Sequence, residues 1–137
     1  MDLIAPLAVQ VGLTLVLLFA MAYFRVKAVT AREVRTRDIA LRQPNWPEKA
    51  TRFANCFHNQ LETPILFYVL VILLIITKLA DSVFLYLAWG FVGIRLLHAY
   101  AQVTKNFSKL RFYSFVLSTT ILTIMWVRFI IKIFVQA

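Results

Sequence analysis

The chain has 137 residues, of which 61% are hydrophobic, and its mean hydropathy is +0.77. This composition is too apolar for a soluble globular domain. The net charge of +9 would suit nucleic acid, but the basic residues lie in short segments between apolar runs, as in loops beside anionic lipid, and no nucleic-acid motif accompanies them.

Four apolar segments predict a single membrane domain, residues 1–137, with four helices. The expected helices cover about 3–24, 47–80, 83–103 and 112–135, and each holds the ~20 residues that span a bilayer. The apolar runs are continuous, whereas the strands of a membrane barrel alternate apolar and polar residues. We therefore expect an all-α, four-transmembrane-helix bundle.

The first apolar run carries no charge from Leu3 to Phe24. It is too long for the core of a signal peptide, and no small-residue cleavage site follows it. We expect this segment to be retained as a membrane helix.

Prolines organise the second helix. The sequence from Pro44 to Glu48 is typical of a turn and a helix start, with Pro47 at the first helical position. Pro64 lies inside the helix, and we expect it to kink or loosen one turn because proline lacks a backbone N–H. Residues 78–81 predict a tight turn before the third helix.

Charge asymmetry between the loops predicts the orientation. The first loop, between Arg25 and Arg52, is rich in arginine, and the third is also basic, whereas the second holds only Lys78. Loops one and three should therefore be cytoplasmic, with both termini on the other side of the membrane. Arg128 and Lys132 oppose this orientation mildly, but their side chains can reach the interface.

Three of the expected helices carry a stripe of polar side chains. Residues three or four positions apart share one face of a helix. The stripes are Arg52, Asn55, Asn59 and Glu62 on the second helix, Arg95, His98 and Gln102 on the third, and Arg111, Ser114 and Ser118 on the fourth. Their common depth predicts a shared cavity. Arginines outnumber acids there, so the cavity should be electropositive and suited to an anion.

Each of these residues also has a purely structural interpretation. Arg95 and Glu62 are about equally well explained as a purely structural ion pair between helices, and we expect them to lie within reach of each other or of a bridging water. His58 and His98 are better explained as hydrogen-bonded residues than as metal ligands, because no cluster surrounds them. Cys56, the only cysteine, gives no disulfide or metal spacing and is best explained as a buried, unreactive thiol.

The pattern Arg52, Asn55, Asn59, Glu62-x-Pro64, at the start of the second of four membrane helices, resembles the MAPEG family, the membrane-associated proteins in eicosanoid and glutathione metabolism. The basic first loop, the short second loop and the arginines on helices three and four extend the resemblance over nearly the whole chain. It implies a bundle that assembles as a homotrimer and binds glutathione between subunits, near the cytoplasmic side.

The resemblance also implies roles for individual residues. Asn59, Glu62 and Arg95 match residues that hold glutathione in the family. Arg111 matches the catalytic arginine that activates the glutathione thiol. Arg35 matches an arginine of the first loop.

The stripes add Arg52, Asn55 and His98 to the same pocket. The chain departs from the glutathione-using members at Asn55, where they have an arginine, and at Gln102 and Phe115, where they have tyrosines. It is more similar to the bacterial branch of the family, and the resemblance implies that glutathione, the expected cofactor, binds weakly.

The leading interpretation is a trimeric membrane protein with an intersubunit cationic pocket for an amphipathic or thiol ligand. If the protein is catalytic, the resemblance implies a glutathione-dependent transferase or peroxidase acting on lipophilic substrates. The expected partners are membrane lipid, a lipophilic small molecule and further copies of the chain, and no nucleic acid. The alternative is a non-catalytic, lipid-binding scaffold that has lost the glutathione site. A proton-coupled exporter using Glu62 ranks lowest, because Glu62 lies near one end of its helix and the first helix is uncharged. A thiolate absorbance band with glutathione would separate the first two.

Overall fold

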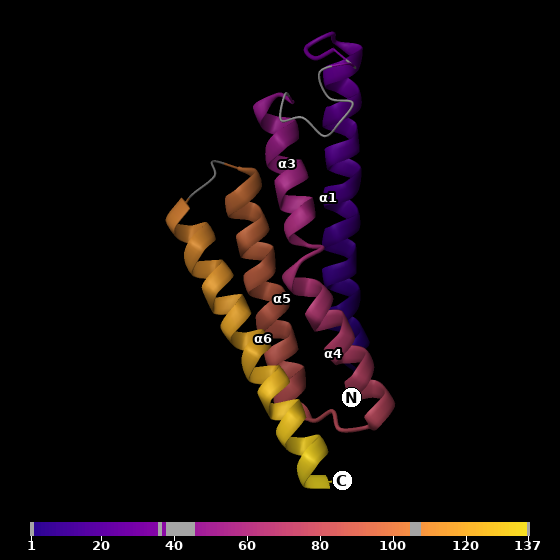
Figure 1. Cartoon of the computed structure of the whole chain (residues 1–137), viewed down its shortest axis with the longest axis vertical. Coiled ribbons are helices and arrows are strands. Elements are labelled where there is room, and N and C mark those ends of the chain that lie inside the picture. Colours follow the sequence, from indigo (N-terminus) through magenta and orange to yellow (C-terminus); the bar gives the residue numbers. More distant parts are fainter. Residues whose placement is uncertain (1, 36, 38–45, 105–107, 137) are drawn as a thin grey trace.

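The structure, a computed structural model, describes residues 2–35, 37, 46–104 and 108–136 (Figure 1). The described residues form helices and no strand. The helices are α1 (Ile4–Thr30), α3 (Glu48–Asn59), α4 (Thr63–Thr77), α5 (Ser82–Val103) and α6 (Ser108–Gln136).

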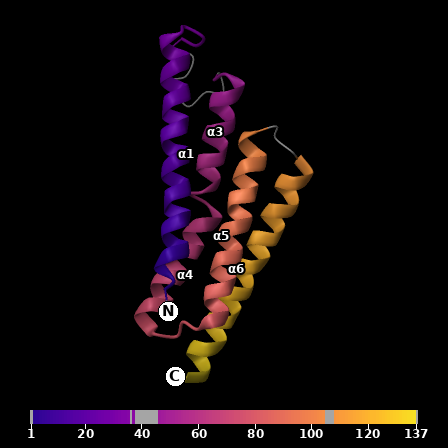
Figure 2. The same cartoon turned by 180° about the vertical axis from the view of Figure 1, so that it is seen from behind.

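Four passes are long and apolar enough to cross a membrane: α1, α3 together with α4, α5 and α6. Both chain ends and the α4–α5 turn lie at one end of the bundle (Figures 1 and 2). The connections from α1 to α3 and from α5 to α6 leave from the opposite end. The prediction of a four-helix membrane bundle is confirmed.

The first helix is longer than the sequence suggested, because it continues past Phe24 to Thr30. It ends in a Schellman motif, in which the Glu33 amide donates to the Ala28 carbonyl (2.9 Å) and the Arg32 amide to the Val29 carbonyl (3.1 Å). Arg32 has the left-handed φ of 61° that this motif requires. Nothing in the sequence before this point breaks the helix, so its basic end continues the apolar segment.

The second pass is disturbed beside Pro64, as predicted, but it is divided into two helices where a kink in one helix was expected. Residues 60–62 separate α3 from α4, and Pro64 lies in the first turn of α4. Proline cannot donate a backbone hydrogen bond to the carbonyl four residues earlier, and its ring clashes with that carbonyl. The local disruption therefore ends one helix and starts another, rather than bending one helix.

The predicted tight turn between the second and third passes is also present. Lys78 ends α4 with a left-handed φ of 57°. Asp81 caps α5, where its Oδ1 accepts a hydrogen bond from the Phe84 amide (3.1 Å).

The main apolar core lies in the half of the bundle near the termini, where α4, α5 and α6 meet. The rings of Phe67 and Phe91 stack there with centroids 4.7 Å apart. The fully buried members include Phe67, Leu70, Val71, Leu74, Phe84, Ala88, Phe91 and Met125. The other half of the bundle has a smaller apolar cluster around Leu17, Cys56 and Ala99, and buries polar groups as well.

Candidate functional site

Polar side chains are buried where the second pass is interrupted and where α5 and α6 face each other. The stripe predicted on α5 is buried over its whole length, and two serines of the α6 stripe are buried with it. These residues are Arg95, His98, Gln102, Ser114 and Ser118. Both serines donate to carbonyls of their own helix, so the ionisable groups of this cluster come from α5.

Arg95 is the central residue of the cluster and is only 1% exposed. Its Nη2 donates to the backbone oxygen of Asn59, 3.2 Å away, at the last residue of α3. A cation at a helix C-terminus satisfies an unpaired carbonyl and opposes the negative end of the helix dipole. The Arg95 Nε is buried without a hydrogen-bond partner among the described residues.

Glu62 does not form the contact with Arg95 that the sequence suggested. The two residues interact electrostatically, but no ion pair joins them within the described part of the chain, and Glu62 is exposed. The cause is the helix break. Glu62 precedes α4 with φ −101° and ψ −98°, so it no longer continues the face of α3 that carries Asn59.

Two amides of the site are paired with each other. The Asn59 Nδ2 donates to the Gln102 Oε1 across the α3–α5 contact, at 2.9 Å. Gln102 stands where, by the resemblance, the glutathione-using members have a tyrosine. In this chain it links α5 to the end of α3 through the hydrogen bond with Asn59.

Arg52 lies at the mouth of the cluster, half-exposed. Its Nη1 donates to the backbone oxygen of Thr104, at the C-terminal end of α5, at 2.5 Å. Its Nη2 pairs with Glu48, one turn earlier on α3. Arg52 therefore caps α5 as Arg95 caps α3.

His98 and Arg111 belong to the same region. His98 is 2% exposed, and its Nδ1 is buried without a hydrogen-bond partner among the described residues. Its ring centroid lies 6.3 Å from that of Phe115 on α6. Arg95 and the half-buried Arg111 both lie close enough to act electrostatically on His98. The α5 and α6 stripes therefore meet in one electropositive region.

Two predicted site residues do not join this cluster within one chain. Arg35 is exposed beyond the end of α1, and Asn55 is exposed on the outer side of α3. With Glu62, they point away from the interior of the bundle.

The sequence analysis did not predict a buried pair of side-chain amides. Gln10 on α1 donates to Gln60 at the helix break (2.8 Å), and Gln60 donates to the Cys56 carbonyl (3.2 Å). Both glutamines are fully buried. The sequence feature that could have predicted this pair is Gln10, a lone amide inside the first apolar run. Cys56 is fully buried, as expected.

The sequence analysis also did not predict an ionic cluster at the opposite end of the bundle. Asp81 Oδ2 accepts hydrogen bonds from Arg128 (2.7 Å) and Lys132 (2.5 Å), both on α6. Desolvation acts to raise the pKa of Asp81, but the hydrogen bonds from Lys132, Arg128 and the Phe84 amide outweigh it and hold the pKa well below its usual range. The two cations that opposed the predicted orientation therefore have a carboxylate partner at the membrane boundary.

Comparison with known proteins identifies the family. The model of the MAPEG family matches residues 3–131, which include the first three passes and most of the fourth. The chain belongs to the MAPEG family. Comparisons with curated proteins and with solved structures give no significant match. The resemblance drawn from the second helix is confirmed.

MAPEG membership and the four apolar passes make the chain a multi-pass integral membrane protein. The helix break, the α5 stripe and the start of α6 all lie inside the matched region. The described residues hold no group of three or more His, Cys, Asp or Glu side chains that could bind a metal ion. In this MAPEG chain the candidate site consists of arginine, amide and histidine donors, which suit an anion.

Proposed function

We propose that this MAPEG protein is a homotrimer that binds an amphipathic anion between subunits and uses glutathione to modify lipophilic substrates. The observation that carries the proposal is Arg95. Its guanidinium is buried, donates to one carbonyl, keeps a buried Nε unpaired, and forms no ion pair within the described chain. A buried charge that forms no ion pair carries a desolvation cost, which the counter-charge of a ligand would offset.

An anionic ligand would supply that counter-charge. Arginine offers five donors in a planar fork that matches a carboxylate. The Nε of Arg95, and the Nδ1 of a neutral His98 in the tautomer that carries its proton there, are buried donors without a partner among the described residues. Glutathione carries two carboxylates, and a carboxylate is the kind of acceptor that such donors require.

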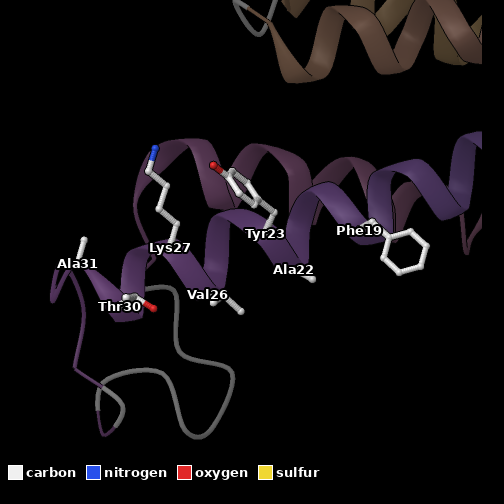
Figure 3. Close-up of a pocket in the computed structure, with 7 residues that line it drawn as sticks. All are labelled: Phe19, Ala22, Tyr23, Val26, Lys27, Thr30 and Ala31. Carbon is white, nitrogen blue, oxygen red and sulfur yellow. The ribbon is translucent and has the colours of Figure 1, made fainter.

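The exposed positions of Asn55 and Glu62 favour a site shared between subunits. Both side chains are exposed on the single chain, so a neighbouring subunit that covers them would enclose a ligand at this surface. The bundle has ample apolar surface for such an assembly. One example is a shallow, open apolar pocket along α1, with a volume of about 550 Å³ (Figure 3). It is lined by Phe19, Ala22, Tyr23, Val26, Lys27, Thr30 and Ala31.

The chemistry we propose is electrostatic. A nearby cation lowers the pKa of a thiol from ~8.5 and so increases the fraction of nucleophilic thiolate. We assign that role to Arg111, at the start of α6. The thiolate sulfur would then attack an electrophilic carbon of a lipophilic substrate, which reaches the site from the bilayer, and displace a leaving group.

A non-catalytic, lipid-binding scaffold is the second candidate. It is favoured by the internal hydrogen bonds of Arg52, Asn59 and Gln102, which already occupy groups that would otherwise contact glutathione.

We also propose the orientation. The end of the bundle with the α1–α3 connection is rich in arginine and should face the cytoplasm, with both termini in the periplasm of a bacterial inner membrane. The pairing of Arg128 and Lys132 with Asp81 supports this orientation, since it reduces the net positive charge of the opposite end.

The test is the absorbance of a thiolate band when glutathione is added to the purified protein. We expect a band in the parent, no band in Arg111→Ala, and an unchanged band in Lys109→Ala, which removes an exposed cation from the same turn. The absence of a band in the parent at saturating glutathione would refute the catalytic proposal and favour the scaffold.

A further inference from the structure

A second surface combines apolar and cationic groups in a pattern unrelated to the glutathione proposal. A groove of about 420 Å³ runs between α5 and α6 on the outside of the bundle. It is lined by Val83, Leu87, Thr123, Ile124, Val127, Arg128, Ile131 and Lys132. This volume lies within the range of ~300–1,000 Å³ for ligand pockets.

The two cations lie at one end of this groove, at the level of the α4–α5 turn. Lys132 donates to the Leu79 carbonyl in that turn (3.3 Å), and both cations bond Asp81, which precedes α5. The apolar residues extend from there along the membrane passes. The groove therefore joins the membrane boundary to the hydrocarbon, which is the path of one phospholipid with its headgroup at the boundary and an acyl chain along the helices.

The charge at this end is not neutral. Asp81 carries one negative charge and faces two positive ones, so the cluster keeps a net charge of +1. Arg128 uses one Nη to bond Asp81, and its buried Nε has no hydrogen-bond partner among the described residues. The side chains of Arg128 and Lys132 are 36% and 26% exposed, so both are accessible from the groove.

Aromatic packing holds these cations in place. Arg128 and Lys132 lie 5.3 Å and 5.5 Å from the ring centroid of Phe84, which is fully buried. A cation over an aromatic face is stabilised and restrained. The cluster therefore presents a fixed guanidinium, with donors to spare, rather than a mobile surface charge.

We propose that this groove is a binding site for one anionic phospholipid of the leaflet on the side of the α4–α5 turn. Its phosphate would accept hydrogen bonds from Arg128 and Lys132, since the planar guanidinium suits phosphate oxygens. One acyl chain would lie on Leu87, Ile124 and Val127. Basic pockets between membrane helices bind anionic headgroups by the same physics.

The experiment is native mass spectrometry of the full-length protein released from nanodiscs that contain equal amounts of phosphatidylglycerol and phosphatidylcholine. We expect the parent to retain phosphatidylglycerol selectively. Lys132→Gln keeps hydrogen-bonding capacity but removes the charge, and leaves Arg128 to pair with Asp81. It should weaken retention about tenfold, the effect of one charge-assisted hydrogen bond. Lys78→Gln, at the same end but outside the groove, removes the same charge and should leave retention unchanged.

A second variant tests the apolar part. Ile124→Trp fills the groove and keeps both cations in the chain, and it should abolish selective retention while the protein stays folded and the oligomer unchanged. Equal retention of the two lipids by the parent would overturn the proposal. So would equal losses in Lys132→Gln and Lys78→Gln, which would indicate diffuse surface charge. A changed oligomeric state in Ile124→Trp would assign the groove to a contact between subunits instead.

Discussion

Arg95, in the middle of α5, donates a hydrogen bond to the backbone oxygen of Asn59, the last residue of α3 (3.2 Å). Arg52, on α3, donates in turn to the backbone oxygen of Thr104 at the end of α5 (2.5 Å). Two antiparallel helices thus cap each other's C-termini with arginines. The exchange fixes the helix break against α5 and sets the position of the cationic cluster.

The capping role of Arg95 predicts unequal effects for two substitutions. Arg95→Ala should lower the free energy of unfolding by about 2 kcal/mol or more, because it removes a charge-assisted hydrogen bond to a helix end and the packing of a buried side chain. Glu62→Ala should change it by less than about 0.5 kcal/mol, as for an exposed residue. Thermal unfolding of the two variants in one detergent is the measurement. Equal losses of stability in the two variants would indicate that Arg95 and Glu62 form a direct ion pair.

Arg52 offers an independent test of the exchange. Arg52→Ala should destabilise the protein by about 1 kcal/mol, since a partly exposed cation at a helix C-terminus contributes 0.3–2 kcal/mol. Glu48→Ala removes only its exposed ion-pair partner on the same helix and should cost under about 0.5 kcal/mol. If Glu48→Ala proved as harmful as Arg52→Ala, the ion pair rather than the cap of α5 would be the stabilising contact.

Asp81 combines a helix cap with an ionic cluster, and two variants separate these roles. Asp81→Asn keeps a good N-cap but removes the charge, so it should lower stability by about 1–2 kcal/mol, discounted for partial exposure. Asp81→Ala should lose about 1 kcal/mol more, the typical contribution of the cap. Chemical unfolding of both variants gives the comparison, and identical values would show that the cap contributes nothing.

The same carboxylate predicts the pH dependence of stability. The pKa of Asp81 is held well below its usual range, so the folded state favours the ionised form. Its contribution is present in full above the unfolded pKa of about 3.9 and is lost as the pH falls towards the lower, folded pKa. Thermal unfolding between pH 7 and pH 3 should show a loss below about pH 4 in the parent that is absent in Asp81→Asn. A parent curve parallel to that of Asp81→Asn would contradict the assignment.

Hydropathy was sufficient to predict the four passes, because the bilayer restricts the chain to helices of limited length. The sequence also predicted the tight turn at residues 78–81. Pro64 predicted a disturbance of the second pass, but as a kink and not as a break into two helices. The helical stripe on α5 likewise predicted the burial of Arg95, His98 and Gln102. The stripe on the second pass failed at Glu62, because helical spacing no longer holds across residues 60–62.

The contacts between passes were not predictable from one sequence. Gln10 pairs with Gln60 only because α1 packs against the helix break. Asp81 meets Arg128 and Lys132 only because α6 returns to the end where α5 begins. Helical periodicity identifies a face, but it does not say which residue of another helix will lie opposite.

Isothermal titration of glutathione into the parent, Asn55→Arg and Arg111→Ala, in one detergent, tests the proposed anion site most directly. The parent should bind weakly. Asn55→Arg should bind about ten to a hundredfold more tightly, because arginine adds a charge-assisted contact at an exposed position that we assign to the shared pocket. Arg111→Ala should keep the oligomer and lose the thiolate band. Tight parent binding that neither substitution changes would contradict this location of the site.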